Sequence, residues 1–395
     1  MRFHLNPIKV NFPIMDNVRI RFTELFGKSD NVQHFFCPGR VNLIGEHIDY
    51  LGGLVMPSAI SLGITAVIRP NKTNAITVHS TDFNETIELD LSSLPNSKQN
   101  NWCDFVLGVV LHLNQIGIEV GGCELLLDSN LPKGSGLSSS AALEVLCYFM
   151  FSCVFGGKEP NLVQMALDCQ RIENEFIGVS CGIMDQFAVA NGQADKAIVL
   201  NCDTLQHEIV PLDLKEYSLL IINTNKPRAL AESAYNQRRK ECDEALKIIS
   251  VERPIENLVE ATLDDLELIS NPIFKKRARH ALTEQLRVQK SVGVLNSGSL
   301  VEFGNLMNES HQSLRDDFEV SCAELDFVVN ELQSSDSCLG ARMTGAGFGG
   351  CCVALVETKR VHKLSQSLNE TYKTRFNRVP EFYDCKPSNG VHIIS

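Results

Sequence analysis

The chain has 395 residues, of which 44% are apolar and 21% are charged, and its formal net charge is −12 at neutral pH. At roughly 150 residues per domain, this length predicts two or three domains. The ordinary apolar fraction excludes wholesale disorder. The acidic balance argues against a nucleic-acid-binding protein and against adhesion to an anionic membrane.

The cysteines and the first residues bear on the cellular compartment. The chain has 14 cysteines but no CxxC pair, and it has no HExxH pattern, so the spacing typical of zinc sites is not found. Residues 1–15 mix polar and charged side chains with apolar ones and lack the apolar core of a secretory signal. The longest apolar run, residues 145–155, falls far short of the roughly 20 residues that span a bilayer. We therefore expect a cytosolic protein whose reduced cysteines serve as small buried apolar residues.

Strand and helix patterns follow one another along the chain. The amphipathic stretch from about Val18 to Gly27 predicts a helix, and the glycine-cut apolar runs of residues 34–60 predict a strand, a loop and a strand. Further strands are expected at residues 64–69, 75–80, 86–91, 123–128 and 197–201. Further helices are expected at residues 104–115, 139–155, 162–177, 232–249 and 273–292. This mixture predicts an α/β or α+β protein.

Two more features concern the second half. A domain boundary is expected near residues 223–227, after which the chain becomes helical and rich in charge. A glycine-rich strand-turn-strand unit is expected at residues 340–356. The chain shows no internal repeat and no low-complexity linker.

The first of three glycine-punctuated segments is LPKGSGLSSSAA, residues 131–142, between an expected strand and an expected helix. Gly134 and Gly136 allow a phosphate to approach the backbone closely, and the helix N-terminus attracts anions. The serines at 138–140 add hydroxyls for phosphate oxygens or a metal. The spacing fits neither a Walker A loop nor a dinucleotide-binding loop, which makes a dinucleotide-dependent oxidoreductase a poor candidate. A plain serine-rich helix cap is the alternative.

The second segment is PGRVNLIGEHIDYLGG, residues 38–53. It gathers Arg40, Glu46, His47 and Asp49 among four glycines. Carboxylates accept hydrogen bonds from hydroxyl groups and a guanidinium donates them, so the set suits recognition of a polyol. A solvated charged turn is the alternative.

The third segment is GARMTGAGFGGC, residues 340–351, whose glycines indicate unusual backbone angles or close approach to another group. A tight hairpin is the alternative. Glu173 and Asp185 are carboxylates in apolar surroundings, which makes them candidates for functional acids, with a structural salt bridge as the alternative. Tyr235 follows in KPRALAESAYNQRR, where it could equally be an aromatic on a helix face.

Taken in order, these segments resemble the motifs of the GHMP kinase superfamily and, within it, of the galactokinases. The resemblance runs from about Val18 to Cys352. It implies an α+β, two-domain GHMP kinase fold. The N-terminal domain, residues 1–225, would be ribosomal S5-like, and the C-terminal domain, residues 226–395, would be ferredoxin-like. The active site would lie in the cleft between them.

The resemblance also implies residue roles. Asp185 would accept the proton of the anomeric hydroxyl, and Arg40 would keep that aspartate ionised and stabilise charge on the transferred phosphoryl group. The implied sugar contacts are Glu46, His47, Ile48, Asp49, Gly182 and Tyr235. The implied nucleotide contacts are Ser80, Gly134, Ser135, Gly136, Leu137, Ser138, Ser139 and Ser140. Ser140 and Glu173 would bind Mg²⁺, and the glycines of residues 345–350 would shape the site.

The implied reaction is phosphorylation of D-galactose by ATP with Mg²⁺, giving α-D-galactose 1-phosphate and ADP, the first committed step of galactose breakdown by the Leloir pathway. We expect a cytoplasmic monomer without nucleic-acid or membrane partners. Ile48 and Leu51 replace the Thr and Asn of the usual galactokinase signature, which could shift sugar preference. The alternatives are a 1-kinase for N-acetylgalactosamine or arabinose, and a sensor that binds galactose and ATP without catalysis.

Overall fold

The computed structural model describes residues 15–28, 30–132, 136–179, 181–227 and 231–394. Its strands are β1 (Gln33–Asn42), β2 (Leu54–Val55), β3 (Pro57–Pro70), β4 (Ala75–Ser80), β5 (Glu85–Asp90), β6 (Cys123–Ser129), β7 (Lys196–Asn201), β8 (His207–Pro211), β9 (Tyr217–Asn223), β10 (Cys338–Thr344), β11 (Cys351–Glu357), β12 (Glu381–Cys385) and β13 (His392–Ile394). Its α-helices are α1 (Met15–Phe26), α2 (Asp104–Gln115), α3 (Ser139–Gly156), α4 (Leu162–Ile172), α5 (Met184–Asn191), α6 (Ala231–Glu252), α7 (Pro272–Asn296), α8 (Leu300–Asp316), α9 (Ala323–Gln333) and α10 (Val361–Phe376). A π-helix, η2 (Glu173–Ile177), continues α4, and short 3₁₀ turns are η1 (Asp49–Leu51), η3 (Leu258–Glu260), η4 (Asp264–Leu268) and η5 (Thr358–Arg360).

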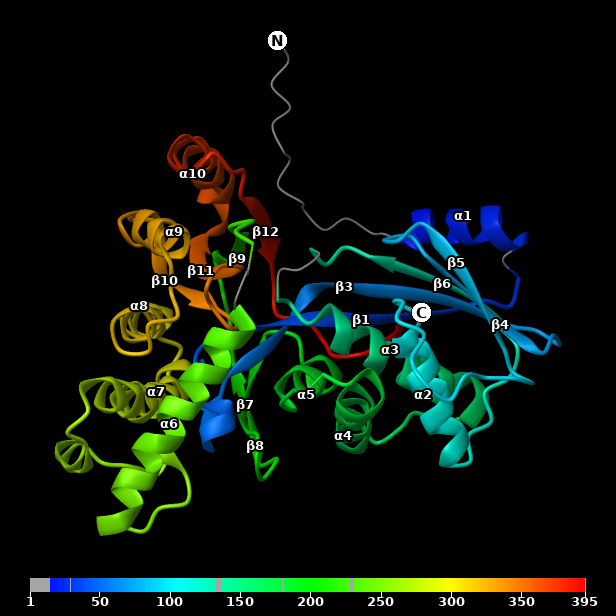
Figure 1. Cartoon of the computed structure of the whole chain (residues 1–395). Helices are drawn as coiled ribbons and strands as arrows, with labels where there is room; N and C mark the ends of the chain where they lie inside the picture. Colours follow the sequence, from blue (N-terminus) through cyan, green and yellow to red (C-terminus); the bar gives the residue numbers. More distant parts are fainter. Residues whose placement is uncertain (1–14, 29, 133–135, 180, 228–230, 395) are drawn as a thin grey trace.

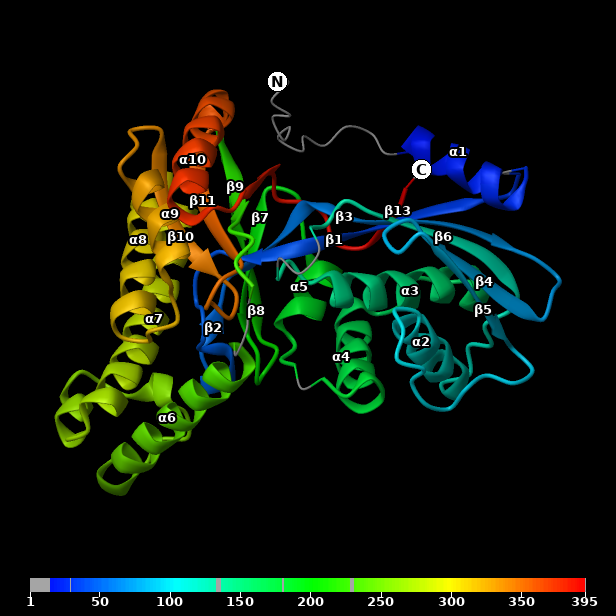
Figure 2. The ribbon, with the colours of Figure 1, turned by 45° about the horizontal axis from the view of Figure 1, so that its top comes forward.

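A six-stranded sheet organises the first half of the molecule, with strand order β13-β1-β3-β6-β4-β5. Its neighbours pair antiparallel except β4 and β6, which are parallel. Helix α1 lies on one face, while α2 to α5 lie on the other (Figures 1 and 2). Val18 and Phe22, one helical turn apart, bury α1 against Val67 of β3 and Leu126 of β6. The long central strand β3 is therefore covered on both sides, which explains its nearly continuous apolar sequence.

Helix α3 is the central helix of this half and carries apolar side chains all around. Among the described residues it is the one helix long and apolar enough to cross a membrane, yet 61% of it is buried inside the protein. A helix packed between a sheet and other helices needs no polar face. Helix α3 is thus a core helix, and its first turn is directed at the site described below.

A second sheet has the strand order β10-β11-β9-β12, and a small third sheet has the order β2-β7-β8. In Figure 1, α8, α9 and α10 line the outer side of the second sheet. Helices α6 and α7 extend below it (Figure 2). The two larger sheets give the α+β organisation that the sequence predicts.

The two larger sheets do not separate at the predicted boundary at residue 225, because one strand from each side of it pairs with strands from the other side. Strand β9 precedes the boundary but pairs with β11 and β12. Strand β13 lies at the end of the described chain but pairs with β1 in the first sheet. The division into residues 1–225 and 226–395 stays a prediction, and hydrogen-bonded strands connect its two sides.

Most of the predicted elements are confirmed. The expected strands at 64–69, 75–80, 86–91, 123–128 and 197–201 lie within or closely match β3, β4, β5, β6 and β7. The strand-turn-strand unit at 340–356 corresponds to β10 and β11. The expected helix at 162–177 is instead α4 followed by the π-helix η2, because the N–H groups of Gly178 and Val179 both bind the carbonyl of Glu173. Helices α5, α8, α9 and α10 were not expected from the sequence.

Candidate active site

The glycine-rich loop before α3 packs directly on β1. A Cβ at Gly39 would lie 2.6 Å from Leu131 Cδ2 and 2.7 Å from the carbonyl oxygen of Leu137, so only glycine fits there. The backbone N–H of Arg40 donates to the same Leu137 carbonyl at 3.3 Å. Gly134 and Ser135, predicted to contact phosphate, lie outside the described residues. Gly39 in β1 therefore allows the loop before α3 to pack directly against this strand.

Arg40 and Asp185, predicted as the catalytic pair, are in direct contact. Arg40 Nε and Nη2 donate to the two carboxylate oxygens of Asp185 at 2.8 and 2.7 Å. Arg40 Nη1 donates to the carbonyl oxygen of Gly136 at 2.6 Å. Asp185 lies in the first turn of α5, and Arg40 lies just after a register shift in β1. Two strong hydrogen bonds in fixed geometry hold the carboxylate in one orientation.

Ser138 connects this pair to the start of α3. Its hydroxyl donates to Asp185 Oδ2 at 2.5 Å, and its backbone has a left-handed φ of 63°. It therefore does not cap α3 through its side chain, which the sequence left as the alternative function of the serines. The next two serines, Ser139 and Ser140, begin the helix and line a cavity.

A cavity of about 120 Å³ lies beside Arg40. Its lining residues are Arg40, Asn42, Gly45, Glu46, His47, Asp49, Val55, Met184, Tyr235, Gly345 and Ala346. Four of the predicted sugar contacts, together with two residues of the third glycine-rich segment, thus surround one space. A Cβ at Gly182 would lie 3.4 Å from Asp49 Oδ2. Ile48, in contrast, is fully buried in the hydrophobic core and is not among the residues that line the cavity.

Glu46 and His47 have protein partners from the second half of the chain. Arg342 Nη2 donates to Glu46 Oε2, and the Gly345 N–H donates to Glu46 Oε1 at 3.0 Å. His47 Nε2 donates to the Ala346 carbonyl at 3.2 Å, so Nδ1 accepts from the Tyr50 hydroxyl at 3.0 Å. Burial lowers the pKa of His47 to about 3, which keeps the ring neutral and this tautomer in place.

Asp49 differs from these two residues in its electrostatic environment. Burial, reinforced by the nearby carboxylates of Glu46 and Asp185, raises the pKa of Asp49 to about 6. Tyr235 lies close by and packs against His47 and Tyr50, with ring centroids 5.4 and 5.3 Å away. The cavity therefore combines two carboxylates, a guanidinium and an aromatic wall, a set that suits a polyhydroxy ligand.

The two predicted metal ligands are neighbours. The Ser140 hydroxyl hydrogen-bonds to Glu173, as does the Cys181 thiol at 3.4 Å. Gln186 Nε2 also donates to Glu173 Oε2. Burial raises the pKa of Glu173 despite these donors. A hydroxyl and a buried carboxylate in contact are oxygen ligands of the kind that Mg²⁺ prefers, so the residues fit this ion.

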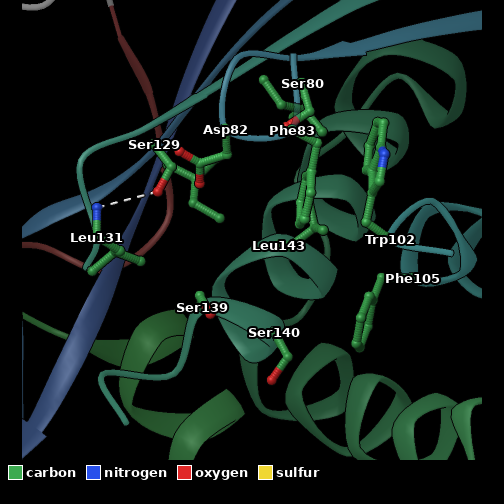
Figure 3. Close-up of a pocket in the computed structure, with 12 residues that line it drawn as sticks. Ser80, Asp82, Phe83, Trp102, Phe105, Ser129, Leu131, Ser139, Ser140 and Leu143 are labelled. Carbon is green, nitrogen blue, oxygen red and sulfur yellow. Dashed lines mark hydrogen bonds between the residues drawn. The ribbon is translucent and has the colours of Figure 1, made fainter. Parts of the chain in front are cut away.

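A larger cavity of about 340 Å³ opens beside the first turn of α3 (Figure 3). The polar residues that line it include Ser80, predicted to lie near a nucleotide, and Ser139 and Ser140. Its apolar side contains Phe83, Trp102 and Phe105, and the rings of Phe83 and Trp102 stack with an interplanar angle of 5°. These aromatics were not expected from the sequence, because Phe83 lies in the turn between β4 and β5, Trp102 just before α2 and Phe105 in its first turn, and the three follow no motif.

Models of known families match three parts of the chain. The galactokinase galactose-binding signature matches residues 20–70. The N-terminal domain of GHMP kinases matches residues 104–193, and the C-terminal domain matches residues 291–374.

Individual relatives match nearly the whole chain. The galactokinase of Clostridium tetani is 40% identical over 96% of this chain and 98% of the relative. The galactokinase of Lactococcus lactis subsp. cremoris is 41% identical over 96% of this chain and 97% of the relative. The crystal structure of Lactococcus lactis galactokinase complexed with galactose has a TM-score of 0.87 at 38% identity and covers 96% of this chain and 100% of that one. The structure of Methanococcus jannaschii mevalonate kinase shares the fold, with a TM-score of 0.68 at 22% identity over 91% of this chain and 99% of that one. The chain therefore belongs to the galactokinase family of the GHMP kinases.

Proposed function

We propose that this galactokinase transfers the γ-phosphoryl group of ATP to the anomeric hydroxyl of D-galactose, giving α-D-galactose 1-phosphate and ADP. The observation that carries this proposal is the contact series Arg40–Asp185–Ser138. Arg40 lines the smaller cavity, and Ser138 directly precedes the serines that line the larger one. Asp185 thus lies between the two spaces. The related structure solved with galactose supports the sugar as the ligand of the smaller cavity.

In this proposal Asp185 accepts the proton of the anomeric hydroxyl as its oxygen attacks phosphorus. The bidentate contact with Arg40 fixes both carboxylate oxygens, so one of them is aimed at the hydroxyl. Phosphoryl transfer depends mainly on positioning and charge stabilisation, and the guanidinium supplies positive charge close to the transferred group. Orientation of the hydroxyl is then as much the work of Asp185 as proton removal.

The sugar is held by the side chains around the smaller cavity. Asp49 and Glu46 accept hydrogen bonds from sugar hydroxyls, with His47, Gly182 and Tyr235 completing the contacts. Ile48 acts indirectly in this scheme. Its buried side chain and its carbonyl, which accepts from the Gly53 N–H at 2.7 Å, keep the loop folded, so an apolar residue suits this position.

The nucleotide occupies the larger cavity in this proposal. The adenine ring packs against Phe83, Trp102 and Phe105, since aromatic faces bind flat heterocycles. The triphosphate follows the loop of residues 134–140 toward Asp185, where free backbone N–H groups and the N-terminus of α3 favour anions.

Ser140 and Glu173 would hold Mg²⁺ against the phosphates. The bound ion supplies charge neutralisation for the phosphoryl group. Glu173→Ala should weaken Mg·ATP binding at least about tenfold while changing galactose binding little, because it removes a charged ligand. Calorimetric titration with each ligand measures both constants. A greater loss of galactose affinity than of Mg·ATP affinity would remove Glu173 from the metal site.

The proposal also includes the cellular compartment and the boundary between the two domains. The reaction takes place in the cytoplasm, where ATP is available, and the 14 free cysteines suit its reducing conditions. The two domains divide near residue 225, although β9, which lies just before this boundary, pairs with β11 and β12 of the second half.

The testing experiment measures ADP release from Mg·ATP with galactose, 2-deoxygalactose, N-acetylgalactosamine, glucose and arabinose. We expect turnover with galactose and much less with N-acetylgalactosamine, glucose and arabinose. Preferred turnover of N-acetylgalactosamine or arabinose would keep the kinase and replace the substrate. Measurable ATP binding without turnover of any sugar would instead support a sensor.

A further inference from the structure

Helix α7 packs against the backbone of residues 45–54, which we call the sugar loop. Three of its side chains make these contacts: His280, Glu284 and Gln285. His280 Nε2 donates to the carbonyl of Glu46 at 3.0 Å, and Gln285 Oε1 accepts from the N–H of Leu54 at 2.8 Å. Glu284 Oε1 accepts from two successive backbone N–H groups, those of Gly45 at 2.9 Å and Glu46 at 3.3 Å. His280 and Glu284 are four residues apart and share one face of the helix, and Gln285 lies beside that face.

Glu284 is fully buried, and each of its oxygens has a partner. Besides the two N–H groups, Oε1 accepts from the Ser310 hydroxyl at 2.7 Å, and Oε2 accepts from Arg287 Nε at 2.7 Å. Burial alone would raise the pKa of Glu284, but the charges of Arg287, His280 and Arg342 lower it to about 2. The side chain is therefore a buried, fully hydrogen-bonded carboxylate. Burying such a charge costs free energy unless hydrogen bonds and opposite charges compensate for the lost water.

The loop that Glu284 contacts has an unusual backbone. Gly45 and His47 have φ values of 94° and 63°, in the left-handed region that a histidine adopts only at a conformational cost. A Cβ at Gly45 would also lie 2.5 Å from the Leu54 carbonyl. A loop in this conformation needs support from outside itself, and α7 provides it at both ends of the loop.

We propose that Glu284 is a positioning residue for the sugar site. Its carboxylate fixes the peptide group between Gly45 and Glu46 and thereby the directions in which Glu46 and His47 reach the cavity. Glu284 does not line the cavity and acts only through the loop. This inference rests on the proposed function, because it takes the loop to be the sugar-binding one.

The test is Glu284→Gln. An amide has a single oxygen, so either the loop N–H groups or Arg287 must face an N–H donor. We expect the KM for galactose to rise about tenfold, the change typical of losing hydrogen bonds to a charged group. The KM for ATP and kcat should stay within about twofold, as for a loss of substrate binding alone. Hydrogen–deuterium exchange of the peptide containing Gly45 and Glu46 should accelerate.

A second substitution tests the hydrogen-bond explanation. Combining Glu284→Gln with Arg287→Gln replaces the opposing donor by a side chain whose oxygen can accept. The amide oxygen at position 284 then remains available to the loop, and we expect the galactose KM to return toward the original value. Glu302→Gln, the same change at an exposed position of α8, is the control and should leave all constants unaltered.

Several outcomes would overturn the inference. An unchanged galactose KM and unchanged loop exchange in folded Glu284→Gln would do so. A parallel rise in both KM values with a lower melting temperature would show a core residue only. If Glu284→Gln does not fold, Gln285→Leu removes another of the three contacts between α7 and the loop without leaving a buried charge. A galactose KM that does not rise severalfold in this variant would overturn the inference. Failure of the unaltered enzyme to phosphorylate galactose would reject the proposed function instead, since loop exchange is measured without turnover.

Discussion

The carboxylate of Asp185 has three side-chain hydrogen bonds, two from Arg40 and one from Ser138. Asp185→Asn keeps the shape of the side chain but places an amide N–H against these donors and removes the proposed proton acceptor. We expect kcat to fall at least about 10²-fold, the usual contribution of a positioned base, while galactose affinity changes only a few-fold. Steady-state kinetics and calorimetric titration with galactose measure the two effects. The exposed Asp264→Asn is the control, and turnover near the original rate in Asp185→Asn would remove this residue from the mechanism.

Asp49 gives a prediction of pH dependence. Its folded-state pKa is raised from 3.8 to about 6, so the folded protein binds this proton more readily than the unfolded chain. Protonation of Asp49 therefore stabilises the folded protein. This contribution is fully present below about pH 4 and is lost as the pH rises through about 6. Asp49→Asn removes the buried charge that is present at pH 7.5. Because one pKa unit corresponds to about 1.36 kcal/mol, the substitution should increase the free energy of unfolding at this pH by up to about 3 kcal/mol.

Urea unfolding at pH 7.5 and pH 4 measures this difference. The gain from Asp49→Asn should be large at pH 7.5 and nearly absent at pH 4. Galactose binding should weaken in the same variant, since the proposed function places this carboxylate in contact with sugar hydroxyls. An equal gain at both pH values would show that the charge of Asp49 is not the cause.

For individual residues, the sequence predicts contacts between side chains that both lie within recognisable motifs. It misses contacts made by residues outside these motifs. Arg40, Asp185, Ser140 and Glu173 are recognisable because each lies in a segment with a distinctive pattern. Glu284 lies 239 residues from Gly45 and in an ordinary amphipathic helix, so no local pattern connects the two. Only the packing of α7 beneath the loop reveals the contact.

Among the structural elements, β1 and the loop before α3 pack closely against each other at Gly39, and this contact can be tested by substitution. A Cβ at Gly39 would collide with the Leu131 side chain and with the Leu137 carbonyl. Gly39→Ala should therefore displace the loop before α3, the proposed phosphate site, and raise the KM for ATP at least about fivefold, more than the KM for galactose. Kinetics with each substrate varied in turn measure the two constants.

A matched glycine serves as the control. Gly293 lies within α7, and a Cβ there would meet no heavy atom within 4 Å. Gly293→Ala should leave both KM values unchanged and stabilise the protein by about 1 kcal/mol, the usual difference between these residues in a helix. Equal kinetics of the two alanine variants would contradict the packing argument.

The predicted elements succeed where hydrophobic periodicity is strong and fail where a single residue changes the hydrogen-bond pattern. Helix α7 follows its predicted range closely, because apolar residues recur at helical spacing. The predicted helix at 162–177 instead changes to a π-helix at Glu173. One extra residue in a helical turn leaves the apolar pattern almost unaltered, and such turns occur often at functional sites.

For the whole molecule, the two larger sheets are joined by the chain and by buried polar contacts. Strand β13 returns to β1, and Arg342, His280 and Glu284 contact residues 42–46 from the second half. We expect a single unfolding transition with a calorimetric-to-van't Hoff enthalpy ratio of about 1. Differential scanning calorimetry measures this ratio. Two resolved transitions, only one of which shifts with galactose, would show that the halves unfold independently.

The fold as a whole could be predicted only through the resemblance to a family. Composition and periodicity indicate a mixture of helices and strands but not which strands pair. The placement of β9 with β11 and β12 depends on residues more than 100 positions apart, whose pairing no local pattern shows.

The stacked ring of Trp102 has a practical consequence. It is the single tryptophan of the chain, and it forms a wall of the larger cavity next to Phe83. All indole emission of the protein therefore originates at this wall. A nucleotide bound in this cavity, as proposed above, would change the polarity around the indole and shift the emission spectrum, whereas galactose bound in the smaller cavity would not touch it. Under the proposed arrangement, the unmodified enzyme contains its own optical reporter for one of its two substrates.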